Sequence, residues 1–125
     1  MTVAKVKRPE AVTDVQRAVG ARIKWARELV VPNRAEFARI MGVDRSTLAK
    51  IEDGARPPSV FNVMDISHRL RVTADYILHG SLVGIDQELA RELIRRHPEL
   101  LTGNYTATVD GTHQKPTTQP GRKKA

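Results

Sequence analysis

Apolar residues recur every three or four positions over most of this chain, from Val12 to Ile94. This is the spacing that places side chains along one side of an α-helix. No part of that stretch alternates between apolar and polar residues for long enough to predict a β-strand. The sequence therefore predicts an all-α fold, in which short helices pack around a single core.

Capping residues, glycines and prolines divide this stretch into six expected helices. Thr13 followed by Gln16 has the pattern of a capping box, and Asn33 followed by Glu36 repeats that pattern. Asp44 is a suitable N-cap residue for the third helix. The expected helices span residues 14–30, 34–41, 45–53, 60–70, 74–79 and 87–97.

Two expectations concern where individual apolar side chains lie. The fourth helix offers Val60, Val63, Met64 and Leu70 to the core. Trp25 falls outside the apolar stripe of the first helix, so its ring is expected to pack against the N-terminal arm or the sixth helix. Contact with a partner protein is the alternative for Trp25.

The distribution of apolar residues predicts four segments. Residues 1–12 are expected to form a flexible arm and residues 13–80 a folded domain. Residues 81–101 are expected to form a helical extension. Residues 102–125 are basic, rich in Thr, Gly, Pro and Gln and poor in apolar side chains, so we expect a disordered tail there.

The charge balance points to nucleic acid as a partner. The 125 residues carry 21 basic and 14 acidic side chains, a net charge of +7. Aromatic residues make up only 4%, so stacking on single-stranded bases is not expected. There is no cysteine, no apolar run long enough for a membrane span and no secretory signal pattern. We therefore expect a cytoplasmic protein that binds double-stranded DNA and no membrane.

Five residues have the spacing that two short helices need in order to cross at a fixed angle. A small residue lets the second helix approach, a glycine permits a left-handed turn, and three apolar residues plug the turn and anchor the second helix. In order, these residues are Ala38, Gly42, Val43, Leu48 and Ile51. This pattern favours a helix-turn-helix over a generic helical hairpin.

The helix expected at residues 45–53 has two distinct faces. Leu48 and Ile51 define its inward face. The opposite face combines short residues with two long hydrogen-bond donors, which suits the major groove of DNA. Its residues are Arg45, Ser46, Ala49 and Lys50.

A long stretch of the chain resembles a known protein family. The stretch from Gly20 to Gly80, about half of the chain, is similar without a gap to the Cro and phage-repressor (Xre-type) helix-turn-helix domains. The shared features are the G-x-x-I-x-x-x-R opening, E-F-A-x-x-x-G-V, S-T-L-x-K-I-E-D-G, R-P-P-S and the final D-Y-I-L-H-G. The resemblance implies a compact five-helix, lambda-repressor-like domain, to which this chain adds a C-terminal helix.

The resemblance also implies a role for each matching residue. Arg27 and Glu52 correspond to a structural ion pair between the first helix and the recognition helix. The family's base-contacting positions are occupied in this chain by Arg45, Ser46, Ala49 and Lys50. Its phosphate-contacting positions are occupied by Arg34, Thr47 and Arg56. Phosphate contacts supply most of the affinity, whereas base contacts discriminate between sequences.

The extension at residues 82–101 has two interpretations. Its apolar strip either packs onto the domain or forms a homodimer, the arrangement with which such domains contact two half-sites. The strip consists of Leu82, Ile85, Leu89, Leu93 and Ile94.

These observations predict a sequence-specific DNA-binding transcriptional regulator of bacterial or phage type, acting as a dimeric repressor on a palindromic operator. An antitoxin-like or coactivator-like adaptor, which binds a protein partner through its C-terminal extension, is the alternative. No enzymatic motif is present, the four histidines do not cluster at metal-ligand spacing, and no cofactor is expected.

Overall fold

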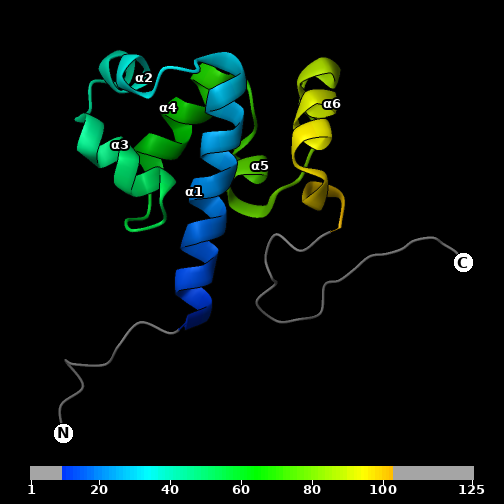
Figure 1. Cartoon of the computed structure of the whole chain (residues 1–125), viewed down its shortest axis with the longest axis horizontal. Helices are drawn as coiled ribbons and strands as arrows, with labels where there is room; N and C mark the ends of the chain where they lie inside the picture. The colour runs from blue at the N-terminus through cyan, green and yellow to red at the C-terminus, as the bar shows by residue number, and fades with distance from the viewer. Residues whose placement is uncertain (1–9, 103–125) are drawn as a thin grey trace, which may run out of the picture.

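The computed structural model describes residues 10–102, and over this range the fold is all-α, as predicted. Long helix α1 lies at the centre, with α2 and α3 on one side of it and α6 on the other (Figure 1). The helices are α1 (Glu10–Val30), α2 (Arg34–Met41), α3 (Arg45–Glu52), α4 (Val60–Leu70), α5 (Ala74–His79) and α6 (Gln87–Arg96). A short 3-10 helix, η2 (Pro98–Leu101), follows α6 and was not predicted.

Helix α1 begins earlier than predicted. It starts at Glu10, so residues 10–12 of the expected arm are helical and Thr13 lies inside the helix. The prediction that Thr13 caps this helix is therefore wrong. Residues 1–9 of the arm and residues 103–125 of the tail lie outside the described residues.

Capping residues define the two ends of α2 and the start of α3. The side chain of Asn33 accepts a hydrogen bond of 2.9 Å from the backbone N–H of Glu36. Gly42 ends α2 in the left-handed conformation, with φ of 75°. Asp44 occupies the N-cap position of α3, as predicted, although its side chain makes no capping hydrogen bond.

The core is formed by side chains from α1 to α6 and from η2 around the middle of α1. Arg22, Arg27 and Glu52 are buried with them. The buried apolar residues are Val19, Ile23, Ala26, Phe37, Ala38, Leu48, Ile51, Val63, Ile66, Leu70, Val72, Tyr76, Ile77, Ile85, Leu93 and Leu100. No helix in the part of the chain that the structure describes is long and apolar enough to cross a membrane.

Helix α4 confirms two of the four predicted core residues, Val63 and Leu70, and contradicts the other two. Val63, Ile66 and Leu70 are buried, whereas Val60 and Met64 are 72% and 60% exposed. Residues 63, 66 and 70 are spaced by three and four, so they share one side of the helix. Val60 and Met64 point away from that side, and their assignment to the core is wrong.

The extension is packed onto the domain. Ile85, Leu93 and Leu100 are buried in the core, and Leu82 and Leu89 are partly buried against it. The ring of Trp25 stacks on that of His97 at the end of α6, with centroids 4.0 Å apart and planes 10° from parallel. Trp25 thus contacts the sixth helix, one of the two intramolecular contacts considered for it.

Candidate nucleic-acid interface

The position of α3 depends on a small set of contacts with α1 and α2. Leu48 and Ile51 are buried, and Ala38 of α2 is buried beside them. Val43, in the turn, is half-buried against the core. These contacts leave one side of α3 without a neighbouring helix (Figure 1).

The outward side of α3 carries the residues that the sequence assigns to base contact. Arg45, Ser46 and Lys50 are exposed, whereas Ala49 and Thr47 are half-buried. Arg56 is exposed in the loop that connects α3 to α4. The structure therefore places two long cationic side chains and one hydroxyl group on the same free face of a short helix.

Glu52, the last residue of α3, is buried and ion-paired. Its carboxylate accepts hydrogen bonds from Arg27 Nε at 2.5 Å and from Arg27 Nη2 at 3.2 Å. Both side chains are almost completely buried, and Arg27 also donates to the carbonyl oxygens of Val31 and Pro32. Because a buried charge is costly without a partner, this bidentate pair holds α3 at a fixed position against α1.

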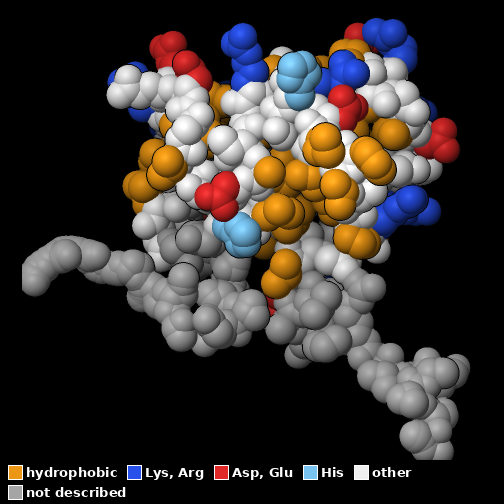
Figure 2. Space-filling view, turned by 180° about the vertical axis from the view of Figure 1, so that it is seen from behind, with side chains coloured by type: hydrophobic (Ala, Val, Ile, Leu, Met, Phe, Trp, Pro, Cys, Tyr) orange, Lys and Arg blue, Asp and Glu red, His pale blue; other side chains and the backbone are white. Residues whose placement is uncertain are grey.

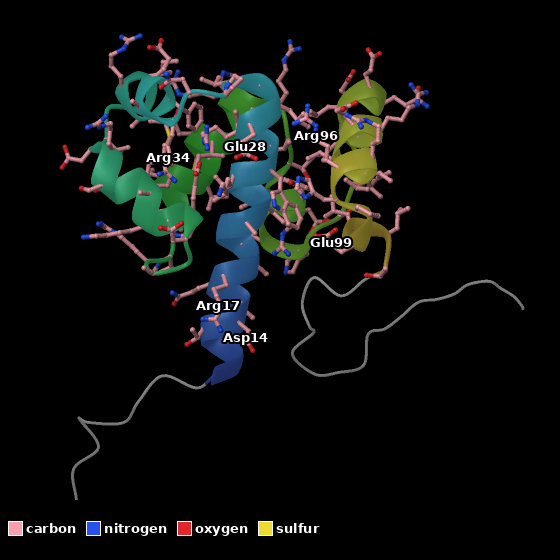
Figure 3. All side chains as sticks on the ribbon, in the orientation of Figure 1. Asp14, Arg17, Glu28, Arg34, Arg96 and Glu99 are labelled. Carbon is pink, nitrogen blue, oxygen red and sulfur yellow. The ribbon has the colours of Figure 1, made fainter. Side chains whose placement is uncertain are left out.

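Arg34 extends this ion pair toward the surface. Its Nη1 atom lies 3.4 Å from Glu52 Oε1, and its side chain is 41% exposed. Arg34 begins α2, and Figure 3 shows it between α2 and α3. One side of the guanidinium group thus contacts a buried carboxylate, while the rest of the group remains accessible to solvent.

The other arginine of α2, Arg39, is paired with an acidic side chain of the same helix. Arg39 pairs with Glu36 one turn earlier, at 2.5 Å, and this hydrogen bond raises the pKa of the Arg39 guanidinium. The unpaired positive charge on this side of the described residues is therefore concentrated on Arg45, Lys50 and Arg56, next to the partly engaged Arg34.

The sequence analysis assigned no structural role to two residues, Gly20, which begins the shared G-x-x-I-x-x-x-R pattern, and Arg22. Gly20 lies where α1 approaches the end of α3, because a Cβ atom there would come within 2.7 Å of the Glu52 carbonyl oxygen. Buried Arg22 donates from Nε and Nη2 to the carbonyl oxygens of Ile77 and Leu78, at 2.9 Å each. An arginine on the inner side of an amphipathic helix was a detectable signal, since such a residue needs buried acceptors.

Tyr76 completes the contact between α1 and α5. Its hydroxyl group donates to the backbone carbonyl oxygen of Arg22 at 2.7 Å. Burial raises the pKa of the Tyr76 hydroxyl far above its ordinary value. The hydroxyl therefore stays protonated and keeps donating, so that α1 and α5 are linked by hydrogen bonds in both directions.

The fold and the α2–turn–α3 unit define a small all-helical domain of the helix-turn-helix class. Residues 23–77, from α1 to α5, match the sequence model of the helix-turn-helix family. This part of the chain is a helix-turn-helix domain of the Xre/Cro type, a type found in DNA-binding transcription regulators. Comparison with curated proteins and with solved structures found no match.

Proposed function

We propose that this protein is a sequence-specific repressor, which recognises a palindromic operator by inserting α3 into the major groove of double-stranded DNA. The observation that carries the proposal is the division of α3 into two faces. Leu48, Ile51 and Glu52 hold the helix in the domain, whereas Arg45, Ser46 and Lys50 face solvent. The major groove, about 12 Å wide, admits a helix presented in this way.

Each cationic residue has a distinct proposed role. Arg45 presents a planar fork of donors, which suits a bidentate contact with guanine, and Lys50 presents a point charge. Ser46 and Ala49 allow the helix to approach the base edges closely. Arg34, Thr47 and Arg56 surround this face and are proposed to bind phosphates.

Selection of bound sites from random duplex DNA, using the full chain, tests the proposal directly. A sequence-specific repressor of this kind enriches one palindrome, with half-sites about 34 Å apart along the duplex. Recovery of unrelated sequences at all salt concentrations would contradict the proposal. Reporter expression from a promoter that carries the enriched site then distinguishes repression from activation.

Replacement of Arg45 or Lys50 by Ala separates base contacts from phosphate contacts. Loss of a base contact is expected to weaken binding to the enriched site by about 1–3 kcal/mol and to relax preference at particular base pairs. Titrations of the enriched site and of random DNA measure this difference. Arg91→Ala, which removes an exposed arginine from α6, is the matched control. Equal losses on both DNAs would assign Arg45 and Lys50 to phosphate contact.

Arg34→Ala is expected to behave differently. If Arg34 binds a phosphate, the affinity falls on every DNA sequence, and the slope of log K against log salt becomes shallower by about one. Glu52 keeps its bidentate pair with Arg27, so the variant is expected to remain folded. Circular dichroism checks the fold, and an unchanged salt slope would remove Arg34 from the interface.

A further inference from the structure

The first turns of α1 lie against the loop that follows α3. Gln16 donates from Nε2 to the carbonyl oxygen of Gly54 at 3.2 Å. A Cβ atom on Gly54 would come within 2.6 Å of Arg17 Cα and 2.7 Å of Arg17 Cγ. Gly54 directly follows Asp53, the C-cap residue of α3. The backbone and the aliphatic stem of Arg17 are therefore held beside the end of α3.

The guanidinium group of Arg17 extends from this contact into solvent. Its side chain is 56% exposed, and Nη2 lies 2.5 Å from a carboxylate oxygen of Asp14, which is 63% exposed. An exposed ion pair of this kind is weak, because water screens both charges. A guanidinium group binds a phosphate through two parallel hydrogen bonds, so a phosphate that comes within reach can displace the carboxylate.

Arg17 also lies where a second phosphate strand is expected. The major groove is bordered by two strands, so a helix inside it has a phosphate backbone on either side. Figure 3 shows Arg34 above the end of α3 and Arg17 below it. Arg56 follows Gly54 by two residues and belongs to the loop that contacts Arg17. Arg34 is thus suited to one strand, and Arg17 with Arg56 to the other.

The shape of the domain agrees with this placement. At its N-terminal end α1 extends past α3 and past the loop that follows α3 (Figure 1). The rear face differs, because Figure 2 shows hydrophobic side chains gathered at its centre, with Lys and Arg side chains at the margins. A phosphate backbone that passes along α3 therefore meets the start of α1 more readily than the rear face.

We propose that Arg17 is a further phosphate-binding residue, and that it exchanges Asp14 for a DNA phosphate when a duplex binds. In the free protein Asp14 holds the guanidinium group along α1. On the duplex the guanidinium group turns to a phosphate oxygen, and the carboxylate of Asp14 is left in solvent. Asp14 therefore lowers the affinity for every duplex, whatever its sequence. The inference rests on the proposed function for duplex binding but is independent of which sequence is preferred.

Two substitutions of Arg17 separate its charge from its packing. Arg17→Met keeps an aliphatic stem beside Gly54 and removes the charge, whereas Arg17→Lys keeps both. On random duplex DNA, Arg17→Met is expected to make the slope of log K against log salt shallower by about one, and Arg17→Lys to keep the wild-type slope. An unchanged slope in Arg17→Met, or the same loss of slope in both variants, would overturn the proposal.

Asp14→Asn tests the exchange itself. It is expected to raise the affinity for every duplex by about two- to fivefold, since the exposed ion pair no longer has to break. In the Arg17→Met background the same substitution is expected to have little effect, and equal gains in both backgrounds would overturn the exchange. Glu92→Gln removes the pair with Arg95 on α6, on the other side of α1 from α3, and is expected to change nothing. Circular dichroism checks the helical content of each variant.

The outcomes separate this proposal from the proposed function. If the wild type binds duplexes but prefers no sequence, the repressor function fails, while the salt slopes still decide the role of Arg17. If the wild type selects one operator and Arg17→Met keeps the wild-type slope, only the role of Arg17 fails. If the wild type binds no duplex at any salt concentration, both are overturned.

Discussion

Gly20 lies where α1 meets the end of α3, and Gly42 lies in the turn that precedes α3, yet the two positions require glycine for different reasons. A Cβ atom on Gly20 would collide with the backbone carbonyl oxygens of Ile51 and Glu52, although the glycine sits inside a regular helix. A Cβ atom on Gly42 would meet nothing within 4 Å, but φ there is +75°. The first constraint is steric contact between helices, and the second is backbone conformation.

These two glycines give a paired prediction. Gly20→Ala is expected to lower the free energy of unfolding by about 3 kcal/mol, at the upper end for overpacking, because backbone atoms cannot rotate away. Gly42→Ala is expected to lower the free energy of unfolding by about 1–2 kcal/mol. Gly42→Asn is expected to lower it less, since Asn tolerates the left-handed region. Chemical denaturation of the three variants measures both effects. Equal losses for Ala and Asn at position 42 would contradict a purely conformational cost.

Local sequence patterns predicted the burial of residues within the helix-turn-helix better than the contacts of the residues around it. The spacing of Leu48 and Ile51 within one short helix was enough to expect both in the core, where the structure places them. By contrast, the need for glycine at position 20 comes from a helix that lies about thirty residues further along the chain. No local pattern reports such a contact, because it exists only once the two helices have crossed.

At the scale of the element, α6 ends in the stack between His97 and Trp25. Desolvation by burial lowers the pKa of His97 below its ordinary value of 6.5, and Arg96 acts in the same direction. Glu99 in η2 and Glu28 in α1 oppose this shift but do not cancel it. Figure 3 labels these three charged residues around the junction of α1 with α6 and η2.

The lowered pKa of His97 makes the stability of the protein depend on pH. Between the pKa of folded His97 and 6.5, the unfolded chain binds a proton that the folded protein does not. The free energy of unfolding is therefore expected to fall as the pH decreases through that window. His97→Phe keeps an aromatic ring for Trp25 but does not titrate, so its melting temperature should fall less between about pH 7 and pH 5. Parallel pH profiles for variant and wild type would contradict this expectation.

Helix α4 illustrates why the existence of an element is easier to predict than its orientation. Its bounds, Val60–Leu70, agree with the prediction, and Ser59 and Asn62 form a capping box at its start. Apolar residues occur on both sides of its first turns, so periodicity alone did not identify the inward face. That choice is made by α1 and α5, which pack against α4 along the side that carries Val63 and Ile66.

At the scale of the whole molecule, α6 and α3 lie on opposite sides of α1 (Figure 1). Leu93→Ala is expected to lower the free energy of unfolding by about 2–5 kcal/mol, because it truncates a completely buried side chain. The affinity for DNA, measured well below the melting transition, is expected to stay the same. Loss of affinity in the folded Leu93→Ala protein would show that α6 contributes to DNA binding after all.

In helix α3, the side chains that stabilise the domain differ from those proposed to recognise DNA. The residues that hold it in place are buried, while Arg45, Ser46 and Lys50 stand in solvent, where substitutions usually change stability by less than about 0.5 kcal/mol. If these residues contact bases as proposed, a duplicated gene can therefore acquire changes at these positions, and with them a different operator, while its product stays folded. Regulators with new operators would then arise from the same domain by substitution of these three exposed residues alone.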